Sequence, residues 1–444
     1  MGMILEKKLQ TPSYVRRTVQ REISLFRKQG NALLAEGIHF REKDGRIVQA
    51  EGREAEGTLP ENTTALFRTV GMDDALFAYS DADETLYDLK HEKSYALSLR
   101  PKQIVCFREG EEKRYYVLTQ SSFSRLKTLT ENEEGAEGET VETTAVIAVR
   151  TSGGDCCGVH YERIFIADGE SVAYSAPLTA EDWTIAIDKA GKIDLPNECG
   201  NIHAIVSFDD RLYLFRERGI TRLYASGDML GFRAEAIPYA CGMMKQGSVV
   251  NCGRYVCFMT ESGLFSFNGQ VCMRISHCGS EAIDAESEIS AAFANGKYYA
   301  TVTVGGERCI FCYDPEQERG HFIRFFADCI VGGVRLLFAQ GGKLYHLTDR
   351  GTGEKGSELY LGKTTFFTSS KDKMLDAIVI DGNGYFRVEI RSGKGLARFV
   401  RGWAGEYLRL PYPIRGAAFS LRLRTNSENC FVRAVTLDFR EAQK

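Results

Sequence analysis

The sequence predicts an all-β protein, a β-propeller of about seven blades (six to eight) followed by a small C-terminal β-sandwich. Two observations carry this prediction. From about residue 65 onward, short apolar runs alternate with turn signals such as Asn-Gly, Gly-Gly and Asp-Gly, which supply the positive φ angles of tight hairpins. After Leu361 the pattern changes to strict alternation of apolar and long polar residues, which is typical of sheets with one buried face.

The clearest unit runs from residue 289 to residue 326. Asn295-Gly296, Gly305-Gly306 and Asp314-Pro315 divide this stretch into four apolar runs. Each of these dipeptides favours a tight turn, so the stretch contains three consecutive hairpin connections. Four short antiparallel strands in series are the outline of one propeller blade.

Residues 1–60 are expected to form an N-terminal arm. The charged stretch 12–29 has no clean β alternation, and the sequence leaves open whether it is helical or extended. The propeller is expected over residues 61–355. Within it, further hairpins are predicted from the following pairs of runs: 75–79 with 85–89, 103–108 with 114–118, 163–167 with 171–174, 202–208 with 211–216, 255–259 with 264–267, and 334–339 with 343–347.

The turn units recur about every 45 residues, a spacing within the range of propeller blades. Radial packing of short sheets buries their faces and leaves only short edges, which favours a propeller over a linear stack. A pair of β-sandwiches is the competing interpretation. The acidic stretch 131–142 has no apolar partner and is expected to be an exposed loop inserted between strands.

The sandwich is expected over residues 365–444, with the boundary in the Gly-rich, charged stretch 351–356. Its strands are indicated by three alternating runs, at 386–391, 419–424 and 435–439.

Composition limits the class of function. The formal net charge of −4 is spread along the chain, which argues against nucleic acid bound by a dominant basic face. The sequence contains no run of about 18 apolar residues, so it predicts no membrane-spanning helix. Thirteen cysteines, an odd number at irregular spacing without a signal peptide, are expected to be free thiols in a cytosolic context.

The candidate chemical sites have simpler structural interpretations. Cys309 and Cys312 have the spacing of a zinc half-site, but residues three apart on a strand point to opposite faces, which favours core cysteines. Cys156, Cys157 and His160 follow a Gly-rich stretch where a nucleophile could be presented, although lining a blade is the favoured interpretation. No P-loop, H-E-x-x-H or G-x-S-x-G motif occurs. We therefore predict a protein without enzymatic activity and assign no catalytic, metal or cofactor-binding residues.

Two tryptophans are better candidates for contact with a partner. Trp183 follows a predicted turn, and Trp403 lies between glycines in a predicted loop with Arg401 and Tyr407. Tryptophan, tyrosine and arginine dominate binding hot spots, so these four residues are the predicted interaction residues. Packing of either tryptophan onto a neighbouring loop is the alternative.

Part of the chain resembles a family of phage proteins. Ser175-Ala176-Pro177 precedes Asp182-Trp183, the run 212–215 reads Leu-Tyr-Leu-Phe, and Cys241-Gly242 precedes Gly247-Ser248-Val249. With the strand pair 258–269, this order of features over residues 153–276 resembles the propeller proteins at the head-to-tail junction, or in the tail, of tailed bacteriophages, often called neck or stabilisation proteins. The Cys-Gly order is reversed relative to that family, and residues 418–423 are similar to strands of its C-terminal domains.

The resemblance implies a structural component of a phage or prophage particle and carries over no catalytic residue. The expected function is assembly by protein–protein contact, in the bacterial cytoplasm during assembly and then in the virion. The expected partners are other virion or tail proteins and further copies of the chain. The alternative is a propeller enzyme or carbohydrate-binding module with its site at the mouth of the central channel, where loops converge. Repeated Asp, Glu or His at equivalent loop positions would favour this alternative, and we find no such repeat.

Overall fold

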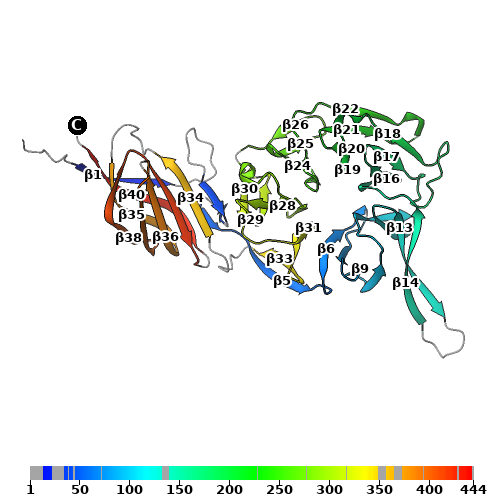
Figure 1. Cartoon of the computed structure of the whole chain (residues 1–444), viewed down its shortest axis with the longest axis horizontal. Helices are drawn as coiled ribbons and strands as arrows, with labels where there is room; N and C mark the ends of the chain where they lie inside the picture. Colours follow the sequence, from blue (N-terminus) through cyan, green and yellow to red (C-terminus); the bar gives the residue numbers. More distant parts are fainter. Residues whose placement is uncertain are drawn as a thin grey trace, which may run out of the picture. The chain divides into compact units, whose positions relative to one another are not determined.

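The structure, a computed structural model, describes residues 14–22, 35–38, 40–43, 46–71, 73–132, 140–227, 229–276, 278–316, 318–348, 357–364, 373–393, 395–427 and 430–442. The chain divides into two compact units (Figure 1). The propeller unit comprises Glu54–Gly320 and Phe325–Leu347. The sandwich unit comprises Met1–Arg53, His321–Arg324 and Thr348–Lys444.

The propeller unit is a series of seven sheets that follow one another along the chain. Strands are given in their order across each sheet. The first sheet contains β10 (Lys93–Ala96), β9 (Thr85–Asp88), β8 (Leu76–Ser80) and β6 (Thr63–Arg68), and the second contains β14 (Thr140–Arg150), β13 (Phe123–Asn132), β12 (Glu112–Leu118), β11 (Gln103–Glu109) and β7 (Val70–Gly71). The third sheet contains β15 (Cys156–His160), β16 (Arg163–Asp168), β17 (Ser171–Tyr174) and β18 (Gly191–Asp194), and the fourth contains β19 (Ile202–Phe208), β20 (Arg211–Arg216), β21 (Gly219–Tyr224) and β22 (Arg233–Ile237).

The fifth sheet contains β23 (Val250–Asn251), β24 (Val256–Thr260), β25 (Gly263–Phe267) and β26 (Cys272–Arg274). The sixth contains β27 (Ala291–Ala294), β28 (Lys297–Val304) and β29 (Glu307–Asp314), and β30 (Arg319–Ile323) follows along the chain, its residues divided between the two units. The seventh contains β31 (Cys329–Val331), β32 (Leu337–Gln340), β33 (Lys343–Thr348) and β5 (Gly52–Thr58). All-β architecture with a propeller of about seven blades, as predicted, is confirmed.

The seventh sheet is completed by a strand from the other end of the unit. β5 precedes the first sheet in the sequence but pairs beside β33, and the amide of Leu59 donates a hydrogen bond to the Gly342 carbonyl at 3.0 Å. In the core, Leu66 and Ala78 of the first sheet pack with Val331 and Leu337 of the seventh. The first and last sheets of the series are therefore in direct contact.

The turns have the backbone that the sequence signals predicted. Asn295 and Gly296 have φ angles of 49° and 74°, and Gly305 and Gly306 have φ angles of 57° and 78°. The Asp284 carboxylate accepts hydrogen bonds from the amides of Gly305 and Gly306 at 3.0 and 2.9 Å. A dipeptide with two positive φ angles joins antiparallel strands with their natural twist, which is why these residue types occur here.

The sandwich unit packs two sheets around one apolar core. One sheet has the order β3 (Phe40–Lys43), β4 (Arg46–Gln49), β40 (Phe431–Ala442), β35 (Lys373–Asn383) and β38 (Tyr407–Gly416), with β1 (Tyr14–Glu22) also paired to β40. The other has the order β2 (Ala35–Ile38), β34 (Ser357–Thr364), β39 (Phe419–Thr425), β36 (Tyr385–Ser392) and β37 (Ala397–Trp403). The core is formed by the apolar members of the alternating runs, among them Phe386, Leu421 and Leu437, as predicted.

The N-terminal residues differ from the expected separate arm. β1 pairs with β40 over nine residues, from Tyr14 opposite Ala442 to Glu22 opposite Ala434, and β2 pairs with β34. Pairing with a sheet edge satisfies backbone groups whatever the side chains are, so a charged stretch without β alternation can still be a strand. The expected boundary at 351–356 and residues 133–139 of the acidic stretch lie outside the described residues.

The helical elements of the described residues are three short 3-10 turns, η1 (Asn197–Cys199), η2 (Met229–Gly231) and η3 (Ser280–Ala282). Within that part of the chain, we find no helix with the length and apolar character needed to cross a bilayer.

Candidate interaction surface

The outer face of the sheet β39–β36–β37 carries a cross-strand row of arginines. Phe386 and Val388 of β36 point into the sandwich core, so Arg387 between them faces outward. In the strand register, Arg387 lies opposite Arg401 of β37 on one side and opposite Arg424 of β39 on the other. Residues directly opposite each other on one face have Cβ atoms about 4.5–5.5 Å apart. Three guanidinium groups are therefore held side by side across three strands.

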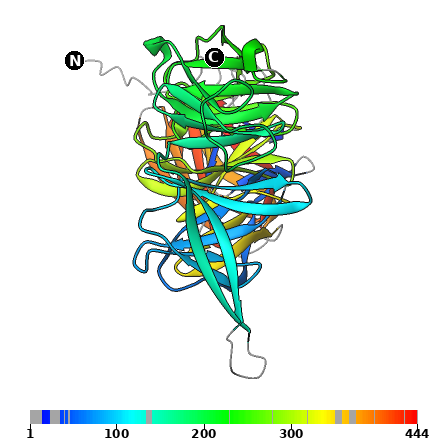
Figure 2. The same ribbon diagram turned by 90° about the vertical axis from the view of Figure 1, so that its right-hand side faces the viewer.

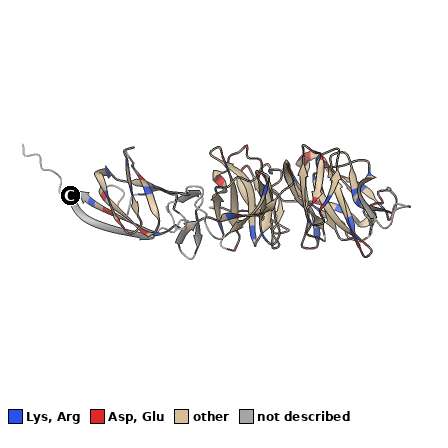
Figure 3. Ribbon diagram, turned by 90° about the horizontal axis from the view of Figure 1, so that it is seen from below, with Lys and Arg blue, Asp and Glu red and all other residues tan. Residues whose placement is uncertain are grey.

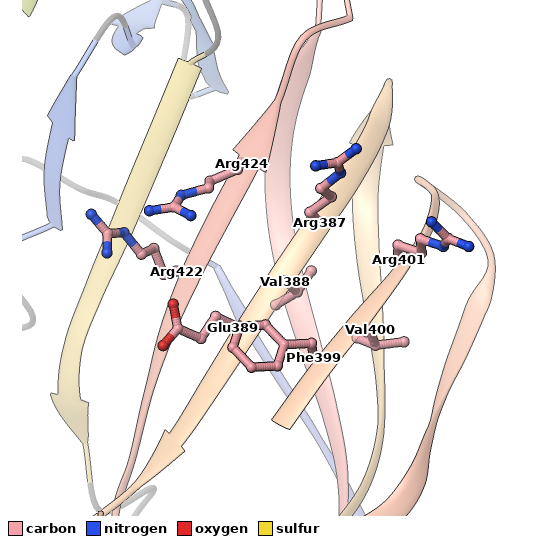
Figure 4. A pocket seen from close by; sticks show the side chains of 8 residues that line it. All are labelled: Arg387, Val388, Glu389, Phe399, Val400, Arg401, Arg422 and Arg424. Carbon is pink, nitrogen blue, oxygen red and sulfur yellow. The ribbon is translucent and has the colours of Figure 1, made fainter. Parts of the chain in front are cut away.

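The next row on the same face combines charge with an aromatic ring. Glu389 lies opposite Arg422 of β39 and Phe399 of β37. Phe399 is 67% exposed. Figure 4 shows the Glu389 carboxylate on the side of Arg422, with the Phe399 ring beside it. The two rows line a groove of about 520 Å³. We call this surface the arginine face; it consists of Arg387, Glu389, Phe399, Arg401, Arg422 and Arg424.

The arginine face has an electrostatic cost in the isolated chain. Like charges directly opposite each other on neighbouring strands destabilise a sheet. Among the described residues, neither Arg387 nor Arg401 has a carboxylate partner, while Glu389 forms an ion pair with Arg391 at 2.5 Å. Basic and acidic residues are interspersed over the propeller unit (Figure 3), whereas Arg387 and Arg401 lie side by side on one face of the sandwich unit. Guanidinium groups bind carboxylates and phosphates through two parallel hydrogen bonds, so the row is suited to an anionic partner.

Of the predicted interaction residues, Arg401 lines this groove, and Trp403 lies two residues further along the same strand. Both are on strand β37 and not in a loop, because the chain turns only at residues 404–406. Trp403 is 56% exposed, and its ring meets that of Tyr385 edge-on at 5.6 Å. The turn is closed by the Glu406 carboxylate, which accepts a hydrogen bond from the Trp403 amide at 2.9 Å.

Tyr407 projects from the opposite outer face of the sandwich. It begins β38, which belongs to the other sheet, and it lies opposite Val379. Its neighbour Leu408 is in the core, so Tyr407 faces away from it. The Tyr407 hydroxyl donates a hydrogen bond to the Asp438 carboxylate. The hairpin 403–407 therefore crosses between the two sheets, and it separates Tyr407 from Trp403.

Trp183 lies in the propeller unit and is packed on several sides. Its indole Nε1 donates a hydrogen bond to the Ala180 carbonyl at 2.8 Å, and its ring meets Phe123 edge-on at 5.8 Å. The Arg150 guanidinium lies over the same ring at 5.2 Å. This residue has the environment of a tryptophan that packs onto neighbouring elements, which was the alternative interpretation.

The candidate Cys-His site is divided between two cores. Cys156 and Cys157 are consecutive residues of β15, so they point to opposite faces, one packing with Phe165 and the other with Ile164. Burial raises the pKa of both thiols. His160 shares a hydrogen bond with the Ser207 hydroxyl at 2.8 Å, and burial lowers its pKa to about 4. A high thiol pKa disfavours the thiolate that nucleophilic chemistry needs. None of the thirteen cysteines, all of which lie among the described residues, forms a disulfide.

Sequence reasoning missed Arg387, Arg422 and Arg424. They were identified only as the polar members of alternating strands, which is correct but says nothing of their neighbours. The alternation places them on the outer face, but strand order and register decide that they lie beside Arg401. An excess of arginine at the outward positions of 387–391 and 420–424 was the available signal.

Comparisons with known proteins give only distant structural likenesses. No protein-family model matches the chain, and no curated protein sequence matches it. Among solved structures, a streptogramin B lyase has 13% identity over 67% of this chain and 97% of its own, with a TM-score of 0.43. The extracellular domain of BT4673 from B. thetaiotaomicron has 12% identity over 78% of this chain and 45% of its own, with a TM-score of 0.44. Kluyveromyces lactis Hsv2 has 9% identity over 65% of this chain and 97% of its own, with a TM-score of 0.36. These likenesses carry no inference about function.

Proposed function

We propose that this chain is a structural and assembly protein of a phage or prophage particle that acts by protein–protein contact. The observation that supports the proposal is the arginine face with its exposed aromatic residues. Arginine and aromatic side chains are enriched in the cores of protein interfaces, and they supply most binding hot spots. Phe399 and Trp403 are 67% and 56% exposed on strands of a packed sheet, where the fold gains little from large aromatic rings.

The phage setting of the proposal comes from the resemblance over residues 153–276. It implies assembly in the bacterial cytoplasm, followed by incorporation into the virion. The sandwich is the docking element in this proposal, because it presents a rigid sheet face on which the contact residues are fixed by strand pairing. A surface on paired strands is more precisely positioned than one on loops, which favours specific contacts.

The test is incorporation of the full-length chain into particles. In cells that carry the gene and produce particles, the protein should co-purify with them through a density gradient at a constant ratio to the other particle proteins. The variant Arg387→Glu/Arg401→Glu should be expressed and folded but depleted from the particles. A matched control, Arg211→Glu/Arg409→Glu, makes the same charge change at two exposed arginines outside the arginine face and should be incorporated normally.

Two outcomes would contradict the proposal. The first is that the protein stays in the soluble fraction while complete particles form without it. The second is that the Arg387→Glu/Arg401→Glu variant is incorporated as well as the control, which would remove the arginine face from assembly.

A further inference from the structure

The partner of the arginine face should carry several carboxylates on a short extended segment. Three of its arginines form one row across three strands, and Arg422 with Phe399 continues the surface along the strands. Carboxylates match the two parallel donors of each guanidinium. A strongly acidic segment would also relieve the repulsion between Arg387 and Arg401.

This chain contains such a segment. Residues 131–142 read Glu-Asn-Glu-Glu-Gly-Ala-Glu-Gly-Glu-Thr-Val-Glu, with six glutamates and no lysine or arginine. The first two residues of the segment end β13 and its last three begin β14, in the second sheet of the propeller unit, so the expected exposed loop does not extend over the whole stretch.

The two strands that carry the acidic segment extend beyond their own sheet. β12 pairs with β13 only from Phe123 to Leu126, whereas β13 and β14 pair with each other as far as Asn132 and Thr140. Near the base, the Thr144 hydroxyl donates a hydrogen bond to the Ser94 carbonyl at 2.6 Å. Figures 1 and 2 show this hairpin, in cyan, extending away from the neighbouring sheets of its unit. A two-stranded ribbon alone is at best marginally stable in water, so a further contact would stabilise its outer part.

We propose that the acidic segment 131–142 of one copy of the chain binds the arginine face of a second copy. This inference rests on the proposed function, and it names the partner as the chain itself. The two surfaces are different parts of one chain, so the contact is heterologous and repeats from copy to copy. Such contacts generate rings if the rotation closes and filaments if it does not.

The experiment is a charge-exchange mixing test by sedimentation velocity at about 0.1 M salt, where the screening length is about 10 Å. The face variant carries Arg387→Glu/Arg401→Glu. The segment variant carries Glu133→Lys/Glu134→Lys/Glu137→Lys. Unmodified protein should associate in a concentration-dependent manner. Each variant alone should sediment as a monomer. An equimolar mixture should associate again, because the intact acidic segment of the face variant can bind the intact arginine face of the segment variant.

The control Arg211→Glu/Arg409→Glu should associate like the unmodified protein. If the face variant has a lowered melting temperature, Arg387→Gln/Arg401→Gln takes its place, and it should also lose self-association. Monomeric unmodified protein at every concentration would overturn the inference. A mixture that stays monomeric would overturn it too, because it would mean that the segment binds within its own chain or not at all.

The proposed function is tested separately. If the unmodified protein is monomeric while the face variant is still depleted from particles, the arginine face binds a different particle protein. In that case the proposed function stands and this inference fails. If neither self-association nor incorporation depends on the arginine face, both fail.

Discussion

Replacing the central arginine of the row should stabilise the free protein while it weakens assembly. Arg387 lies between Arg401 and Arg424, so Arg387→Glu converts two like-charge neighbours into two opposite-charge neighbours. Cross-strand charge pairs are worth roughly 0.2–1 kcal/mol each on an exposed sheet face. Allowing for solvent screening, we expect the free energy of unfolding of the sandwich unit to rise by roughly 0.5–2 kcal/mol. Arg387→Gln removes repulsion without adding attraction, so it should give about half of this gain.

Urea unfolding followed by tryptophan fluorescence measures this gain. The chain has two tryptophans, and in a Trp183→Phe background Trp403 alone reports on the sandwich unit. The gain should shrink at about 1 M salt, where the screening length falls to about 3 Å. The control Arg409→Glu lies on the opposite outer face and should give no comparable gain. A lower unfolding midpoint for Arg387→Glu, or a gain that is unchanged by salt, would refute the electrostatic account of this surface.

Three further predictions concern other parts of the chain. Trp403→Ala removes a ring that is a little under half covered, so it should lower the free energy of unfolding by about 1–2 kcal/mol. It should also weaken association by about 2 kcal/mol or more. A destabilised variant with unchanged association would exclude Trp403 from docking. Because burial lowers the pKa of His160 from 6.5 to about 4, the unfolded chain binds a proton at this imidazole more readily than the folded chain does. The folded protein should therefore lose stability as the pH falls from about 6.5 toward about 4. Over this range the melting temperature should fall less in His160→Asn than in the unmodified protein. An equal fall in both would assign the effect to other groups. In thiol titration of the native protein, Cys199 should react before Cys272, whose pKa is raised by burial and by the neighbouring Cys241. The unfolded protein should show thirteen thiols with or without reductant, and a lower count without reductant would reveal a disulfide.

The hairpins were predictable because their signals are local. The turn at Asn295-Gly296 requires positive φ angles that few residue types adopt, so the dipeptide alone indicates where the chain reverses. The same holds for the alternation at Phe386, Val388 and Ile390, where a period of two marks the buried face of a strand. Strand positions and the identity of the core side chains therefore follow from short stretches of sequence.

Pairing between distant strands was not predictable in this way. Nothing in residues 14–22 indicates that they pair with residues 434–442, because backbone hydrogen bonds to a sheet edge do not depend on a side-chain pattern. The separation of Trp403 from Tyr407 has the same origin. They are four residues apart in the sequence, but the chain crosses from one sheet to the other between them.

The sequence by itself determined which side chains are outward on the predicted alternating strands, including Arg387, Arg422 and Arg424. Arg401 was instead expected in a loop, and the structure places it on strand β37. Only the tertiary structure decided that these arginines are neighbours, because the order β39–β36–β37 and its register bring together residues 387, 401 and 424. The physical reason is that the pleat of a single strand decides on which face a side chain lies, whereas the pairing of strands decides which side chains are neighbours. Strand pairing depends on how the whole apolar core is buried.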